Sequence, residues 1–187
     1  KKFYENKYIY ADSTFFNIFS FPLISGDPNK ALTLPNSMVI SEEMGAKYFT
    51  GENPLGKFLT MNNDKSYQVT GVMEKVPGNS HLQFDFIISF TSQKIPQGFN
   101  WFSFNANTYV LLPENYSAGK LEQKLPAFVE KYTGEQQKQY GIHVRYFLQP
   151  LAKVHLFSDL DNDATKSGII YVYIFSIIAV FILVIAC

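Results

Sequence analysis

The sequence has little of the chemistry on which catalytic and metal sites depend. Its 187 residues include one cysteine, which is the last residue, Cys187, and three histidines, His81, His143 and His155. A single cysteine excludes an intrachain disulfide and a cysteine-based metal site. The histidines are scattered, and neither an H-E-x-x-H nor a G-x-S-x-G motif is present. We therefore expect no catalytic residue, no metal and no cofactor, and we expect that the chain is not an enzyme.

Net charge is also lacking, because 16 basic residues balance 16 acidic ones. A neutral chain has no field that would attract nucleic acid, so we expect no nucleic-acid partner. Apolar residues, in contrast, make up 47% of the chain and include 18 Phe and 12 Tyr. This composition supports a sizeable core in one domain or two small lobes, and its aromatic content favours β-rich packing.

The last part of the sequence, from Ile169 to Cys187, is a run without charge, proline or glycine. At about 1.5 Å per residue, such a helix would be about 28 Å long, close to the roughly 30 Å hydrocarbon core of a bilayer. We therefore expect a transmembrane helix over residues 169–187, truncated within a longer protein. The acidic stretch before it has only Lys166 nearby, which favours an extracytoplasmic location for the preceding domain.

Two segments partly match ligand-binding loops. Gly51 to Lys57 fits G-x-x-x-x-G-K, but Phe58 stands where a phosphate loop has Ser or Thr, and Pro54 removes one N–H donor. A helical pattern precedes this segment and a strand pattern follows it. We interpret it as a helix-to-strand connector, with Gly51 in the left-handed region.

The second segment, Asp159 to Asp163, begins like a calcium loop. Ala164 stands at its required glycine, and Ile170 at its bidentate glutamate. A solvated stretch before the membrane is the favoured interpretation, with a weak surface cation site as the alternative.

Local patterns predict a mixture of helices and strands. Ser41 and Ser117 are expected to cap two helices, Pro126 to kink the second or mark its start, and Gly134 to end it. Asp12 or Ser13 is expected to cap a short helical turn. The expected strands are Tyr8–Ala11, Met38–Ile40, Lys57–Met61, Tyr67–Val76, Phe84–Phe90, Thr108–Leu112, His143–Leu148 and Val154–Phe157, the third and fourth forming a hairpin across residues 62–65.

An aromatic stretch around residues 98–107 allows two interpretations. Trp101, Phe102 and Phe104 are candidates for a partner-binding surface, because aromatic side chains are favoured at the centre of interfaces. Their alternation with Ser103 and Asn105 also suits a half-buried strand, which we favour.

The order of three segments, YADSTFFNIFSFPLISGDP, MVISEEMGAKYFTGENPLGK and YQVTGVMEKVPGNSHLQFDF, resembles the extracytoplasmic core domain of MacB/FtsX-type ABC transporter permeases. The residues that carry the resemblance include aromatic, turn and capping positions. They are Phe15, Phe16, Phe19, Ser25, Gly26, Ser41, Glu42, Gly51, Glu52, Asn53, Pro54, Leu55, Gly56, Val69, Thr70, Gly71 and Val72.

The resemblance implies an α+β, two-lobed extracytoplasmic domain followed by a transmembrane helix. Residues 1–80 would form an inserted α/β lobe, residues 81–168 a porter-like βαβ lobe with its juxtamembrane linker, and residues 169–187 the second helix of the permease. Such a domain transmits ATP-driven movement of the membrane helices to periplasmic substrates or partners, for export or extraction of a lipoprotein, a peptide or a small toxic molecule.

Partners also follow from the resemblance. They are a cytoplasmic ABC ATPase, on a separate subunit or domain, a second permease copy that completes a dimer, and a periplasmic adaptor or substrate. The location would be the bacterial inner membrane, with the domain facing the periplasm. The alternative is a membrane-anchored sensory or adhesive binding module, which the aromatic stretch around Trp101 motivates.

Overall fold

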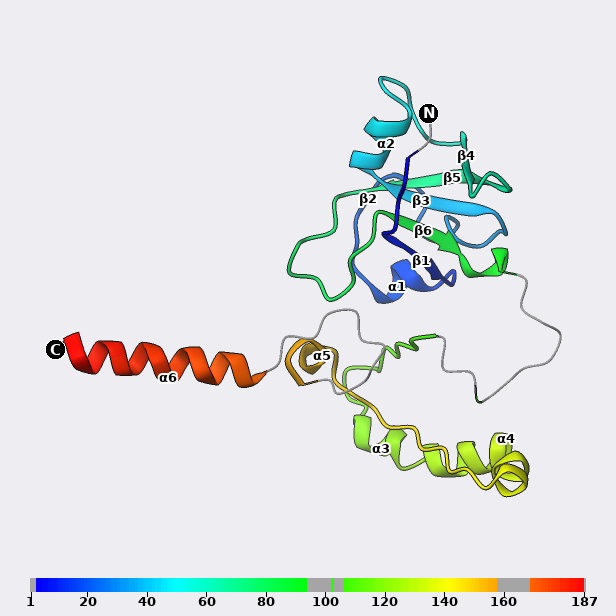
Figure 1. Ribbon diagram of the computed structural model, residues 1–187. Coiled ribbons are helices and arrows are strands. Elements are labelled where there is room, and N and C mark those ends of the chain that lie inside the picture. Colours follow the sequence, from blue (N-terminus) through cyan, green and yellow to red (C-terminus); the bar gives the residue numbers. More distant parts are fainter. Residues whose placement is uncertain (1–2, 94–101, 103–105, 158–168, 187) are drawn as a thin grey trace. The chain divides into compact units, whose positions relative to one another are not determined.

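The computed structural model describes residues 3–93, 102, 106–157 and 169–186 (Figure 1). The chain forms two compact units, Lys1–Leu111 and Leu112–Cys187, which we call unit 1 and unit 2. Each unit is described by itself.

Unit 1 is built on a six-stranded mixed sheet. Its strands are β1 (Tyr8–Ala11), β2 (Leu23–Gly26), β3 (Ser37–Ser41), β4 (Phe58–Met61), β5 (Lys65–Met73) and β6 (Phe86–Ser89). They lie in the order β1-β6-β3-β5-β2, and β4 also pairs with β5. The pairs β1–β6 and β3–β5 are parallel, whereas β3–β6, β2–β5 and β4–β5 are antiparallel.

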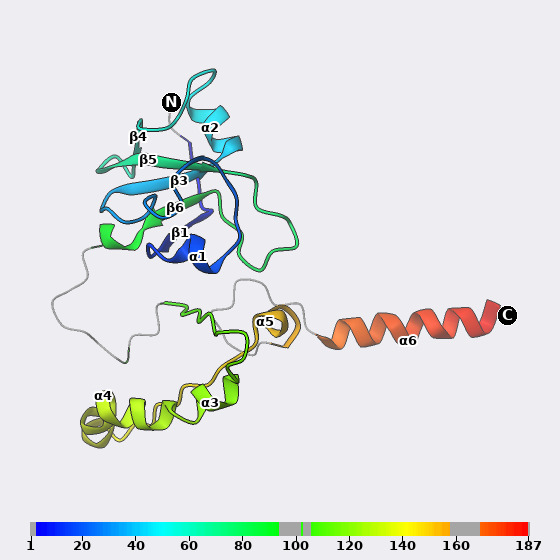
Figure 2. The same cartoon turned by 180° about the vertical axis from the view of Figure 1, so that it is seen from behind.

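Both faces of this sheet carry a hydrophobic core, because successive side chains of β3 and β6 alternate between them. Val39 and Ile87 belong to the first core, which contains Phe15 of the short helix α1 (Phe15–Ile18). Ile40 and Ile88 belong to the second core, against which the helix α2 (Glu42–Tyr48) packs. Figures 1 and 2 show α1 beside β1 and α2 at the other end of unit 1.

Several local predictions in unit 1 are confirmed. β1 has the predicted bounds, and β4 and β5 form the predicted antiparallel hairpin. Its turn uses Asn62 and Asn63, at φ 53° and 59°, a left-handed conformation that asparagine tolerates well. The prediction that Asp12 or Ser13 caps α1 is wrong, because Thr14 is its N-cap residue; Asp12 Oδ1 instead accepts the Thr14 N–H at 2.8 Å. The strand β2 was not predicted, because Ser25-Gly26-Asp27-Pro28 has the composition of a turn.

The sheet continues past residue 80, where we expected a second lobe to begin. β6 pairs with both β1 and β3, and a 3₁₀ turn, η1 (Phe90–Ser92), follows it. The compact units therefore divide between Leu111 and Leu112. Which residues form an inserted lobe and which a porter-like lobe stays a prediction.

Unit 2 consists of helices α3 (Ala118–Glu122), α4 (Leu125–Tyr140), α5 (Leu151–Phe157) and α6 (Ile169–Ala186). Pro126 lies at the start of α4, where a missing N–H costs nothing, so it marks a helix start as predicted. The prediction that Gly134 ends this helix is wrong. α4 continues to Gly141, whose φ of 64° makes it the left-handed C-cap.

Three predicted strands are absent from the described residues. Residues Thr108–Leu112 and His143–Leu148 form no ladder, and Val154–Phe157 lies within α5. A strand needs a neighbouring strand to bond its N–H and C=O groups. In residues 143–148, side chains of α3 and α4 accept two of the N–H groups instead. Val144 donates its N–H to Gln137 at 2.7 Å, and Leu148 donates its N–H to Glu122 at 3.4 Å.

The apolar run at the end of the sequence forms helix α6, so its helical conformation is confirmed. Among the residues that the structure describes, no helix meets the length and hydrophobicity needed to cross a membrane.

Candidate functional site

Several of the residues that carry the family resemblance lie on β5 or pair with it. Ser25 and Gly26 pair with Val72 and Gly71, so β2 lies directly against this strand. Gly26 has φ +102°, and a Cβ there would lie 2.6 Å from the Thr70 carbonyl oxygen and 2.8 Å from the Gly71 Cα. Both the backbone conformation and the close approach therefore require glycine.

Residues 69–72 of β5 also hold the neighbouring strand and loop. Thr70 Oγ1 donates to the Ala31 carbonyl oxygen at 2.6 Å, which ties the 27–36 loop to the sheet. Gly71 pairs with Val39 where the β3–β5 register shifts, and a Cβ on Gly71 would lie 3.3 Å from Val39 Cγ2. These positions are therefore positions of close packing between strands.

The segment from Gly51 to Gly56 is the predicted connector between α2 and β4. Gly51 and Gly56 have φ +77° and +81°, and Asn53 Oδ1 accepts the Leu55 N–H at 3.0 Å. Gly56 donates its own N–H to the Val69 carbonyl oxygen at 2.7 Å, and Lys57 to that of Pro54 at 3.0 Å. These N–H groups are engaged within the protein, so they are not available to hold a phosphate.

Ser41 and the acidic residues after it fix the start of α2. The Met44 N–H donates to Ser41 Oγ at 3.4 Å, and Glu42 and Glu43 lie in the first turn, where the helix dipole favours negative charge. Glu43 also pairs with Lys75 at 2.7 Å, and this hydrogen bond raises the pKa of Lys75. The Ser41-Glu42 positions therefore have a capping role.

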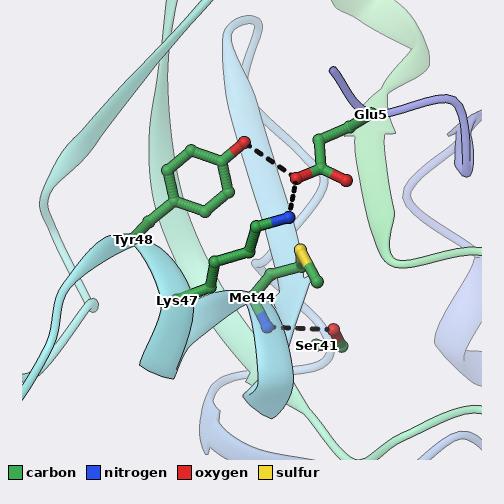
Figure 3. A network of polar contacts seen from close by, with 5 residues as sticks. All are labelled: Glu5, Ser41, Met44, Lys47 and Tyr48. Carbon is green, nitrogen blue, oxygen red and sulfur yellow. Dashed lines mark hydrogen bonds and ion pairs between the residues drawn. The ribbon is translucent and has the colours of Figure 1, made fainter. Parts of the chain in front are cut away.

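A polar network that the sequence did not suggest links the N-terminal segment to α2 (Figure 3). Glu5 Oε1 accepts from Lys47 Nζ at 2.5 Å and from the Tyr48 hydroxyl at 3.1 Å. Lys47 Nζ also lies 4.6 Å from the centre of the Phe3 ring, which packs edge-on against Tyr48. Burial, and then the bond to Glu5, raise the pKa of Tyr48 to about 12. Because Glu5 and Lys47 are 42 positions apart, no local pattern could have revealed this network.

The other residues singled out in the sequence are the aromatic partner-binding candidates, the acidic stretch and the histidines. Trp101 and Phe104 lie outside the described residues, and Phe102 is a half-buried turn residue. The acidic stretch 159–163 also lies outside them, and no group of three metal-ligating side chains occurs in the described part of the chain. His81 packs in an aromatic cluster, with its Nε2 3.2 Å from the Tyr109 hydroxyl and its ring 6.2 Å from that of Phe19.

Comparison with known proteins identifies the family to which the chain belongs. The signature of the MacB-like periplasmic core domain matches residues 3–128, well over half of the chain. Among solved structures, a domain of a candidate permease protein from Porphyromonas gingivalis is 27% identical, with a TM-score of 0.55. The match covers 71% of this chain and 62% of that one, so the chain spans less than two thirds of its structural relative. No curated protein matches the sequence. The chain belongs to the family of MacB-like periplasmic core domains.

Proposed function

We propose that this chain is the periplasmic domain of an ABC transporter permease, through which ATP-driven movement of membrane helices reaches a periplasmic substrate or partner. The observation that carries the proposal is the match of residues 3–128 to the MacB-like periplasmic core domain. The likeness to a candidate permease domain supports the same role.

Transmission of movement requires a body that moves as a unit, and the packing of unit 1 suits this requirement. Both faces of its sheet are covered by a core, and β2 approaches β5 so closely that a Cβ on Gly26 has no room. The N-terminal segment is joined to α2 through Glu5, Lys47 and Tyr48. A displacement applied to one strand would therefore be passed to its neighbours with little internal deformation.

Partners and location are part of the same proposal. ATP hydrolysis would occur on a separate ABC ATPase subunit or domain, and this chain would have no enzymatic activity of its own. A second permease copy would complete a dimer, and a periplasmic adaptor or substrate would meet the extracytoplasmic surface. Anchoring in the bacterial inner membrane would use residues 169–187, a suggestion that rests on their apolar sequence.

Co-purification from native membranes tests the proposal. We expect the full-length protein carrying this chain to bring down an ABC ATPase and to form a complex that hydrolyses ATP. A matched sample in which the ATPase nucleotide site is disabled should keep the complex and lose the hydrolysis. A full-length protein with one membrane anchor and no associated ATPase would instead support the sensory or adhesive module.

A further inference from the structure

We propose that unit 1 contains a binding site for a small neutral aromatic molecule with an N–H or O–H donor. The site is a cavity of about 450 Å³ between the N-terminal segment, α2 and the β4–β5 hairpin. It is lined by Phe3, Tyr4, Glu5, Asn6, Tyr8, Met38, Tyr48, Leu59, Thr60, Met61, Asn62, Phe86 and Ile88. The volume lies in the range of small-molecule sites, which is about 300–1,000 Å³. This inference does not depend on the permease role.

The cavity exists because α2 is too short to cover its face of the sheet. α2 has 7 residues and is therefore about 10 Å long, and it follows β3 directly from Ser41. Met38, at the other end of β3, lies on the floor of the cavity with Phe86 and Ile88 of β6. The hairpin supplies one wall through Leu59 to Asn62, and the N-terminal segment supplies another.

The lining favours an aromatic ligand. Met38 and Met61 contribute thioether groups, which make favourable contacts with aromatic rings and adapt to ligand shape. Five of the lining side chains are themselves aromatic and can stack on a ring or meet it edge-on: Phe86 on the floor, and Phe3, Tyr4, Tyr8 and Tyr48 at the walls. A planar ring would therefore find apolar contact on the floor and aromatic contact at the walls.

The polar lining residues favour a donor and disfavour an anion. Asn6, Asn62 and Thr60 offer oxygen acceptors, and Glu5 is the only charged residue among those that line the cavity. Among the described residues, both hydrogen bonds of the Glu5 carboxylate use Oε1 (Figure 3), which leaves its second oxygen to a ligand. A ligand N–H or O–H can therefore bind that oxygen, whereas a carboxylate or phosphate has no donor to offer it, and the ammonium beside it, Lys47 Nζ, already pairs with Glu5 Oε1.

The four methionines of the chain allow a site-resolved test with indole as the probe. In the full 187-residue chain with ¹³C-labelled methionine methyl groups, indole should shift the Met38 and Met61 signals saturably. A dissociation constant of about 1 mM or tighter is expected for a ligand of this size. Met73 belongs to the core on the opposite face, and Met44 packs in the second core without lining the cavity, so both are internal controls. Equal shifts at Met73, or no saturable shift at Met38 and Met61, would overturn the proposal.

Two tryptophan variants on β4 provide a matched pair. Leu59 lines the cavity, so Leu59→Trp should fill it and weaken indole binding at least tenfold. Phe58, its neighbour, is 63% exposed and does not line the cavity, so Phe58→Trp should bind indole like the unsubstituted chain. Indole binding that is equal in the two variants would contradict this site.

A third variant covers the case in which Leu59→Trp fails to fold, which a displaced Met73 signal would reveal. Tyr4 lines the cavity and is 92% exposed, so Tyr4→Ala removes one aromatic wall without disturbing a core. We expect binding to weaken severalfold. Unchanged affinity in Tyr4→Ala would count against the aromatic wall. Loss of ATPase association in the full-length protein, in contrast, would bear only on the permease proposal.

Discussion

Unit 1 and unit 2 differ in how much of their hydrophobic sequence reaches a core. The buried apolar side chains of the described residues lie in unit 1, with the single exception of Val129 on α4. In unit 2, Tyr140 is 64% exposed and Phe147 is 50% exposed. The comparison shows that the apolar side chains of a strand-like or helix-like pattern are buried only where a neighbouring element packs against them. Unit 1 has such neighbours on both faces of its sheet, and unit 2 has few in the described part of the chain.

The largest predicted effect concerns unit 1 and tests the close approach of β2 to β5. Gly26→Ala should destabilise unit 1 by about 2–5 kcal/mol, because it combines a left-handed backbone with a Cβ 2.6 Å from a carbonyl oxygen. Urea denaturation monitored by amide NMR signals of β3 and β5 would measure the change. The matched control is Gly78→Ala, where nothing lies within 4 Å of the new Cβ and the change should stay within about 0.5 kcal/mol. Equal effects of the two substitutions would contradict the close approach of β2 and β5.

A second substitution tests the small core of unit 2. Val129 is 5% exposed, and its carbonyl oxygen accepts from Thr133 Oγ1 at 2.7 Å. Val129→Ala should destabilise α4 by about 1–2 kcal/mol through lost burial. Hydrogen exchange should then accelerate in α3 and α4 and stay unchanged in β3, β5 and β6. Acceleration that spreads equally through both units would show that they unfold together.

Two helix starts give a direct comparison between the units. Ser41 accepts the Met44 N–H at the start of α2, whereas Ser117 at the start of α3 makes no such side-chain bond. Ser41→Ala should therefore cost about 1 kcal/mol, and Ser117→Ala should cost little. The midpoints of thermal or urea unfolding measure both. A larger cost at Ser117 would mean that its hydroxyl caps the helix in solution.

The prediction with the smallest effect near neutral pH is a pH dependence in unit 1. The pKa of Tyr48 is raised to about 12, first by burial and then by Glu5, from an ordinary value near 10. The folded state thus retains the phenol proton more strongly than the unfolded state does. This contribution to stability is complete below pH 10 and is lost as pH rises from about 10 to about 12.

Ultraviolet titration of tyrosinate checks this dependence. The difference between the unsubstituted chain and Tyr48→Phe should show one tyrosine that ionises near pH 12. Glu5→Gln should lower the pKa of Tyr48 only in part, since burial is the larger cause. A Tyr48 that ionises near pH 10 would contradict both its burial and its bond to Glu5.

The sequence predicts much of unit 1 because its signals there are local. Ser41 before two glutamates identifies the start of α2, and Asn62 and Asn63 identify the hairpin turn. The family resemblance also rests on such local positions. The edge strand β2 was not predicted because Gly26 is a residue typical of turns. In the sheet, however, Gly26 is a strand residue that packs closely against β5.

The candidate binding cavity was not predicted from sequence, for a different physical reason. Its lining comes from the N-terminal segment, α2, the hairpin and β6, so it depends on pairings between distant residues. The same dependence explains the failures in unit 2. Residues 143–148 have a strand-like pattern, but Gln137 and Glu122 accept two of their N–H groups, and no strand pairs with them in the described residues.

The parallel pairing of β1 with β6 has a consequence for the order in which the protein folds. Tyr8 pairs with Phe86, about 80 residues later, so β1 has no sheet partner until most of unit 1 is available. The hairpin of β4 and β5, in contrast, closes over only a few residues and can form early. During folding, β1 would therefore be among the last strands to join the sheet. Its aromatic side chains, Tyr8 and Tyr10, would meanwhile be exposed to chaperones and to other copies of the chain.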